Sequence, residues 1–126
     1  MAARVKKRKI VIVDSDTFLA GMYARRFELG AWNAFVAETI DEAKKLIVSK
    51  KPEVVIVDLE TDPDGCSFIR EMNNEFPKTF FVVLTKLGDQ KIIKDAISAG
   101  ADSYLLKGHF VPSEVREKID RLVSEA

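Results

Sequence analysis

Five short apolar runs rich in β-branched residues recur along the chain, and an amphipathic stretch follows each of them. This alternation restricts the possible folds more than any other feature. We predict strands at residues 9–14, 33–38, 53–58, 79–85 and 102–107. Runs such as KIVIVD and EVVIVD are apolar without a break, which is typical of strands covered on both faces. The pattern therefore predicts a parallel sheet with helices on both sides.

The stretches between the strands carry helical periodicity and helix-start signals. From residue 17 to about residue 29, apolar residues recur at spacings of three and four, which predicts a helix with a wide apolar stripe. Phe18 and Met22 belong to that predicted stripe. Thr39 and Glu42 have the spacing of a capping box at the start of the next helix.

Length and composition indicate one ordinary globular domain. The 126 residues are predicted to form a single domain over 1–126, in which residues 1–8 are a basic lead-in. An apolar fraction of 47% and a charged fraction of 32% exclude a disordered chain. A net charge of zero argues against a dedicated nucleic-acid binder, and no apolar run approaches the length of a membrane span. Cys66 is the only cysteine, so no internal disulfide can form and a cytoplasmic location is expected.

Polar side chains end four of the five predicted strands. These residues are Asp14, Asp58, Thr85 and Lys107, with Asp16 two residues beyond the first. Ligands of open parallel sheets bind beyond the carboxyl ends of the strands, so these side chains are predicted to share a site. Clustered carboxylates repel one another, and a divalent cation such as Mg²⁺ relieves the repulsion. One aspartate can then form an aspartyl phosphate while Mg²⁺ and the lysine neutralise its charge.

Four segments together resemble the receiver domain of two-component response regulators. They are KIVIVDSD, VVIVDLE with DG after it, VVLT and AGADSYLLK. The segments occur in the family's order, and the resemblance covers about residues 8–124. It implies an α/β, flavodoxin-like (βα)5 fold with a five-stranded parallel sheet of order 2-1-3-4-5 and helices on both faces.

The resemblance also implies a role for each residue of the predicted site. Asp58 is the phosphorylation site, and a sensor histidine kinase or a phosphotransfer protein is the phosphoryl donor. Mg²⁺ is the implied cofactor, with Asp14, Asp58 and the backbone carbonyl of Glu60 as its ligands. The implied catalytic and switch residues are Thr85, Lys107 and Tyr104.

A receiver domain of this kind is expected to be a signalling switch and not an enzyme with turnover. In the family, the signal reaches a face made by the fourth helix, the fifth strand and the fifth helix. A downstream effector protein or domain is the expected partner, and a homodimer through this face is a further possibility. Direct nucleic-acid binding by this domain and membrane association are not expected.

Ser15 departs from the family's pattern at the predicted metal site. It stands where a second acidic residue is usual, and Asp16 follows it as a candidate substitute ligand. If the strand continues, residues 14 and 16 point the same way. If the backbone turns at Ser15, only Asp14 faces the site.

Two alternative functions stay open from the sequence. Asp62 and Asp64 add acids to the loop after Asp58, where they would repel a dianionic phosphoryl group. Together with Ser15 they favour a pseudo-receiver, a protein-interaction module that acts without phosphorylation. The stretch DSDTF also approaches the Asp-x-Asp-x-Thr motif of haloacid-dehalogenase-like phosphatases. Phe18 stands where that motif requires threonine, so the phosphatase is the minor alternative.

Overall fold

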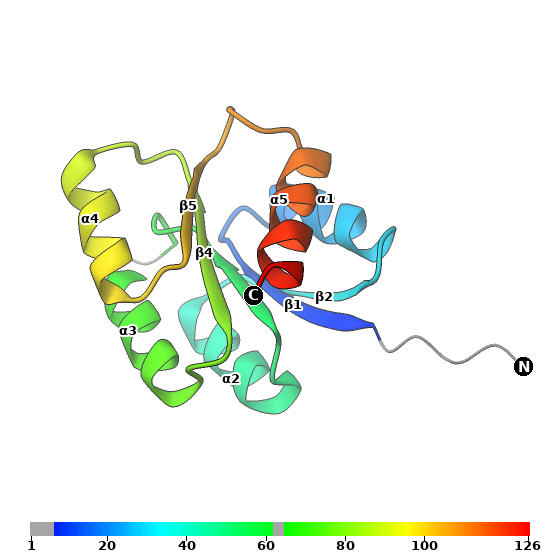
Figure 1. Ribbon diagram of the computed structural model, residues 1–126, viewed down its shortest axis with the longest axis horizontal. Coiled ribbons are helices and arrows are strands. Elements are labelled where there is room, and N and C mark those ends of the chain that lie inside the picture. The colour runs from blue at the N-terminus through cyan, green and yellow to red at the C-terminus, as the bar shows by residue number, and fades with distance from the viewer. Residues whose placement is uncertain (1–6, 62–64) are drawn as a thin grey trace, which may run out of the picture.

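The predicted strands form one parallel sheet in the order β2-β1-β3-β4-β5 (Figure 1). The computed structural model describes residues 7–61 and 65–126. Within them the strands are β1 (Arg8–Val13), β2 (Trp32–Ala37), β3 (Val54–Val57), β4 (Phe80–Thr85) and β5 (Ser103–Leu106). The predicted α/β fold and its strand order are confirmed, and each strand end lies within one residue of its predicted position.

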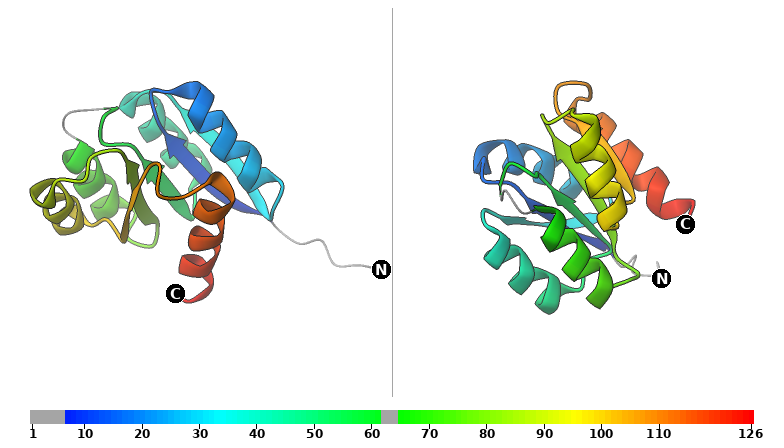
Figure 2. Two further views of the ribbon diagram at one scale, coloured as in Figure 1. Left: turned by 90° about the horizontal axis from the view of Figure 1, so that it is seen from above. Right: turned by 90° about the vertical axis from the view of Figure 1, so that its left-hand side faces the viewer.

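Helices cover both faces of the sheet (Figure 2). In the described residues they are α1 (Thr17–Glu28), α2 (Ile40–Lys50), α3 (Gly65–Glu75), α4 (Gln90–Ala99) and α5 (Pro112–Ser124). α1 and α5 pack on one face, whereas α2, α3 and α4 pack on the other. None of these described helices has both the length and the apolar character that a membrane crossing requires.

Each face of the sheet has its own apolar core. Along β1, Val11 and Val13 belong to the core under α2, α3 and α4, whereas Ile10 and Ile12 belong to the core under α1 and α5. All four side chains are at most 2% exposed. Because both faces are covered, successive residues of the strand are both apolar, which explains the unbroken runs in the sequence.

Polar side chains cap the starts of α1 and α2. Oδ1 of Asp16 accepts the backbone N–H of Leu19 at 3.1 Å. At α2 the hydroxyl of Thr39 accepts the N–H of Glu42 at 3.2 Å, as the capping-box pattern predicts. In a capping box the Glu42 carboxylate would accept the N–H of Thr39. Here it accepts the N–H of Glu38 at 2.9 Å instead. The bonds from Leu19 and Glu42 satisfy N–H groups that have no partner within their helix.

The buried stripe of α1 is narrower than predicted. Its buried residues are Ala20, Tyr23 and Phe27, whereas Phe18 is 80% exposed and Met22 is 46% exposed. The prediction of a wide stripe was therefore wrong for Phe18 and Met22. With 3.6 residues per turn, these two side chains lie on the side of the helix opposite the buried three, and only one side contacts the sheet and α5.

The predicted basic lead-in is shorter than the sequence indicated. Arg8, which was assigned to it, is the first residue of β1, and its backbone N–H donates to the carbonyl of Ala31 at 3.0 Å. Residues 1–6 lie outside the described part of the chain. The sheet therefore begins within the basic run.

Gly100 is a position where only glycine fits without strain. Its φ is +120°, and a Cβ there would lie 2.5 Å from Nδ2 of Asn73 in α3. We expect Gly100→Ala to lower the free energy of unfolding by about 1–3 kcal/mol, measured by urea denaturation. Gly21 in α1 is the matched control, because nothing lies within 4 Å of its Cβ position. Gly21→Ala should raise the free energy of unfolding by about 0.5–1 kcal/mol, and equal effects of the two substitutions would contradict this account.

Candidate functional site

The carboxyl ends of neighbouring strands bring four polar residues to one edge of the sheet. Asp14 follows β1, Asp58 follows β3, Thr85 ends β4 and Lys107 follows β5. The first three are buried, with exposed fractions of 4%, 4% and 0%. Parallel strands end at the same edge, so residues far apart in the chain meet there.

The ammonium group of Lys107 joins the two buried aspartates. Its Nζ donates to Oδ2 of Asp58 at 2.6 Å and to Oδ2 of Asp14 at 2.8 Å. The side chains of Lys107, Asp14 and Asp58 are 7%, 6% and 5% exposed. Two carboxylates buried side by side repel each other, and the shared ammonium group offsets that repulsion.

The carboxylates keep Lys107 in its charged form. Burial by itself would lower the pKa of Lys107, because burial disfavours charge. The hydrogen bonds to Asp14 and Asp58 and the charges of these carboxylates outweigh burial, so the pKa is raised above its ordinary value of 10.5. Lys107 is therefore a cation at neutral pH, suited to neutralising charge and not to accepting a proton.

A short turn after each aspartate holds its other carboxylate oxygen. Oδ1 of Asp14 accepts the N–H of Asp16 at 2.9 Å, and Oδ1 of Asp58 accepts the N–H of Glu60 at 3.0 Å. Both carboxylates are thus fixed by the backbone on one side and by Lys107 on the other. Because the chain turns directly after β1, Asp16 does not continue the direction of Asp14, and its Oδ1 caps α1.

Thr61 connects the loops after β1 and β3. Its Oγ1 accepts the backbone N–H of Ser15 at 3.1 Å, and its own N–H donates to the carbonyl of Asp58 at 3.1 Å. Ser15 is an exposed residue that contributes this N–H to the link. Sequence reasoning missed Thr61, because a threonine in a polar loop carries no signal of a partner 46 residues away.

Thr85 and Tyr104 both contact the loop between β4 and α4. The Thr85 hydroxyl accepts the N–H of Leu87 at 3.4 Å, and the Tyr104 hydroxyl donates to the carbonyl of Leu87 at 2.5 Å. Tyr104 is half-buried against the core under α2, α3 and α4. Burial is the main cause that raises its pKa, so the hydroxyl keeps its proton and acts as a donor.

Tyr23 in α1 is a second residue near the site that sequence reasoning missed. It is 4% exposed, and burial raises the pKa of its hydroxyl. The charge of Lys107 lowers this pKa, and the charges of Asp14 and Asp58 raise it. The Tyr23 hydroxyl is therefore close enough to these three residues for their charges to act on it. Helical periodicity indicated only an apolar packing role for this residue, because the pattern does not report what the hydroxyl faces.

The aspartate pair fits a magnesium ion. Mg²⁺ in proteins is commonly held by one or two carboxylates, with waters and phosphate oxygens completing its shell. Asp14 and Asp58 present two carboxylates to one place, and carboxylate oxygens accept more than one partner. In the described ranges, no group of three Asp, Glu, His or Cys side chains comes together as a metal site. The predicted loop acids Asp62 and Asp64 lie outside the described residues.

Comparison with known proteins agrees with this geometry. The family model described as response regulator receiver domain matches residues 10–120. The chain is 26% identical over 121 residues to the chemotaxis protein CheY of Thermotoga maritima, covering 91% of this chain and 97% of that protein. A crystal structure of a response regulator from Thermotoga maritima aligns with a TM-score of 0.86 and 25% identity, covering 94% of this chain and 98% of that one.

Other relatives are longer than this chain. The photosynthetic apparatus regulatory protein RegA of Rhodobacter capsulatus is 28% identical over 101 residues. The match covers 79% of this chain and 55% of RegA. The chain thus spans about half the length of this curated relative.

Replacing Lys107 by methionine should destabilise the fold, because two buried carboxylates lose their cation. At neutral pH we expect the free energy of unfolding to fall by about 3 kcal/mol, measured by urea denaturation. The pKa of Lys107 is raised in the folded state, so its contribution is complete below its ordinary value of 10.5 and is lost as the pH rises through the folded value. The difference between wild type and Lys107→Met should therefore shrink at strongly alkaline pH.

Lys86→Met is the matched control, because Lys86 neighbours Thr85 but is exposed. It should change the free energy of unfolding by less than about 0.5 kcal/mol. A Lys107→Met variant that is as stable as Lys86→Met would contradict the importance of the buried pairing.

Proposed function

This chain belongs to the response regulator receiver domain family, and we propose that it accepts a phosphoryl group on Asp58 from a sensor histidine kinase or a phosphotransfer protein. Receiver domains of response regulators are signalling domains and not classical enzymes. The observation that carries the proposal is the buried contact of Asp58 with Lys107 at the carboxyl edge of the sheet. An aspartate held beside an ammonium group can receive a phosphoryl group whose negative charge that ammonium neutralises.

In the proposed reaction, a carboxylate oxygen of Asp58 attacks the phosphorus atom of a phosphohistidine donor. The new bond joins this oxygen to phosphorus, the bond from phosphorus to the histidine nitrogen breaks, and the nitrogen keeps the electron pair. Lys107 and the N–H of Glu60 hold the Asp58 carboxylate in one orientation before attack. Lys107 stays protonated and binds a phosphoryl oxygen, and the Thr85 hydroxyl is the proposed donor to another.

Mg²⁺ is the cofactor in this proposal. Its proposed ligands are Asp14, Asp58 and the backbone carbonyl of Glu60. When bound, it supplies positive charge that stabilises the oxygens of the transferring phosphoryl group. Asp16 stays a proposed additional ligand through Oδ2, since its Oδ1 caps α1. Asp14 has the further role of holding Lys107 in place opposite Asp58.

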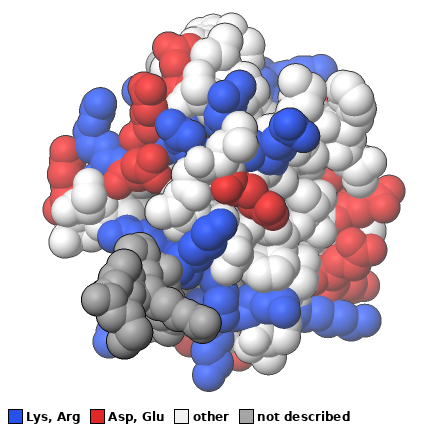
Figure 3. Space-filling view, turned by 90° about the vertical axis from the view of Figure 1, so that its right-hand side faces the viewer, with Lys and Arg blue, Asp and Glu red and all other residues white. Residues whose placement is uncertain are grey.

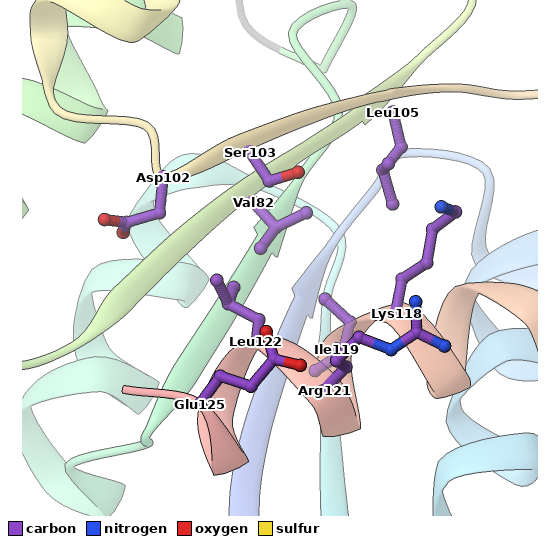
Figure 4. A pocket seen from close by; sticks show the side chains of 9 residues that line it. All are labelled: Val82, Asp102, Ser103, Leu105, Lys118, Ile119, Arg121, Leu122 and Glu125. Carbon is purple, nitrogen blue, oxygen red and sulfur yellow. The ribbon is translucent and has the colours of Figure 1, made fainter.

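The proposed output surface is the face formed by α4, β5 and α5. Thr85 and Tyr104 both bond Leu87, so new contacts at Asp58 are expected to reach the start of α4 through this loop. A cavity of about 250 Å³ lies between β4, β5 and α5 (Figure 4). Its apolar lining residues are Val82, Leu105, Ile119 and Leu122, and its charged lining residues are Asp102, Lys118, Arg121 and Glu125. Apolar and charged groups together support the binding of an effector or a second copy here.

A phosphorylation-independent receiver is the second candidate function. Lys107 already binds Oδ2 of both aspartates, and Ser15 replaces an acid that is usual in the family. Mg²⁺ would therefore compete with the ammonium group of Lys107 for the carboxylates of Asp14 and Asp58, without a third carboxylate at position 15. In this case the domain would bind its partners without a change at Asp58.

Phosphorylation of Asp58 can be tested with a small-molecule phosphodonor such as acetyl phosphate. In the presence of Mg²⁺ we expect the wild-type protein to gain the mass of one phosphoryl group, measured by intact mass spectrometry. Asp58→Asn should gain none, because an amide is not a nucleophile for this reaction. Asp95→Asn is the control, because Asp95 is an exposed residue of α4, and this variant should still be phosphorylated.

Beryllofluoride with Mg²⁺, which imitates an aspartyl phosphate, gives an independent readout. We expect chemical shift changes at Thr85 and Tyr104 in nuclear magnetic resonance spectra. No mass gain and no shift change at millimolar Mg²⁺ would contradict the proposal and favour the phosphorylation-independent module. A phosphoryl group mapped to Asp14 would instead favour the phosphatase-like alternative.

Ser15→Asp should strengthen Mg²⁺ binding severalfold, because it adds a third carboxylate beside Asp14 and Asp58. The backbone N–H of residue 15 still bonds Thr61 in this variant, so the loop keeps its geometry. Titration of Mg²⁺ by calorimetry measures the change. Ser15→Asn has the same shape without the charge and should leave the affinity unchanged. Equal affinity of Ser15→Asp and the wild type would show that this side chain does not reach the site.

A further inference from the structure

A group of lysines lies at the edge of the sheet opposite Asp58. A cavity of about 370 Å³ is lined there by Lys7, Lys9, Ser49, Lys50, Lys51 and Glu53, and we call it the lysine cavity. Figure 3 views the right-hand side of the molecule in Figure 1 and shows Lys and Arg side chains gathered along the lower edge of that face. The proposed phosphorylation uses none of these residues.

Three chain segments meet at the lysine cavity. Residues two apart in an extended chain lie on the same face of a sheet. Lys7 and Lys9 therefore lie on the same face as Val11, whose side chain belongs to the core under α2. α2 ends just before Lys51, which turns the chain with a φ of +50°. The N–H of Glu53 donates to the carbonyl of Lys9 at 2.9 Å and ties the third segment to β1.

Positive charge exceeds negative charge in the lysine cavity. Glu53 is the acid among the lining residues, and its carboxylate pairs with Arg8 at 3.7 Å. Lys7, Lys9 and Lys51 form no ion pair with any described residue. Cations at the C-terminal end of a helix are favourable, which accounts for lysines at the end of α2. It does not account for Lys7 and Lys9, which come from the start of the sheet.

We propose that the lysine cavity binds a ligand with two or more adjacent phosphate groups. A single exposed ion pair contributes little to binding, so the ligand needs several charges close together. Adjacent phosphates have that charge density, and lysine residues from separate segments line one volume. A volume of about 370 Å³ lies in the range of small-molecule sites.

The lining argues against other anionic partners. Binding of single-stranded nucleic acid relies on aromatic faces, but the nearby Phe35 ring is covered by Lys50, whose Nζ lies 5.0 Å from its centroid. Adsorption to an anionic membrane relies on apolar side chains beside the lysines, and the lining residues include none. An acidic peptide carries one charge per carboxylate, whereas a phosphate group carries up to about two.

This proposal goes beyond the proposed function and does not depend on it. The lysine cavity lies at the amino ends of β1 and β3, whereas Asp14 and Asp58 follow their carboxyl ends. Binding to the cavity can therefore be measured without Mg²⁺ and without phosphorylation. Failure of one proposal leaves the other unaffected.

The test is a titration of the full chain with sodium tripolyphosphate at low salt, followed by nuclear magnetic resonance. We expect saturable shift changes at residues 7–9 and 49–53, with none at Asp58. Lys9→Gln combined with Lys51→Gln should weaken binding at least about fivefold, since two contacts are lost. The matched control is Lys91→Gln with Lys94→Gln, which removes the same charge from exposed positions of α4 and should leave the affinity unchanged.

Titrations with adenosine triphosphate and with an oligoglutamate peptide distinguish the possible ligands. Adenosine triphosphate bound more tightly than tripolyphosphate would support the proposal with a nucleotide as ligand, and equal affinity would support it with the phosphate chain alone. If the double variant does not fold, Lys7→Gln, which replaces an exposed residue before β1, should weaken binding about twofold. Unsaturable shifts, equal weakening by the control variant, or equally tight binding of an oligoglutamate peptide would overturn the proposal.

Discussion

One ammonium group shared by two buried carboxylates holds the carboxyl edge of the sheet together. Removing Lys107 leaves two buried carboxylates without their cation, whereas removing one carboxylate leaves the ammonium group paired with the other. Lys107 follows the edge strand β5, and its backbone N–H donates to the carbonyl of Thr85 at 2.8 Å, which positions the start of its side chain. From there it reaches the ends of β3 and β1. Strand order thus determines which charges meet.

In the proposed function, the same contacts would connect a change at Asp58 to the loop before α4. Asp58 has one carboxylate oxygen bound to the backbone and the other bound to Lys107. In the proposed reaction Lys107 exchanges a carboxylate oxygen for a phosphoryl oxygen, and the Thr85 hydroxyl gains a new acceptor. Leu87 bonds both Thr85 and Tyr104, so a small change in bonding reaches a loop that leads into α4.

Charge is separated along the strand direction. The aspartate pair lies at the carboxyl edge of the sheet, whereas the lysine cavity lies at the amino edge, although the net charge of the chain is zero. Total charge therefore says little about the partners of either edge. The separation follows from parallel strands, because every strand start lies at one edge and every strand end at the other.

Elements and strand-end positions could be predicted from the amino-acid sequence, because burial on both faces produces unbroken apolar runs and each run stops at a polar residue. The strands, and the positions of Asp14, Asp58 and Lys107 directly after strands, could therefore be predicted without a structure. Tertiary packing settled the contacts of the loops and the outer surface, which have no periodicity. It turned Asp16 toward the start of α1 and brought Thr61 to Ser15, 46 residues away. Periodicity shows that a helix has an apolar side, but only packing decides which residues that side buries, as the exposed Phe18 and Met22 demonstrate.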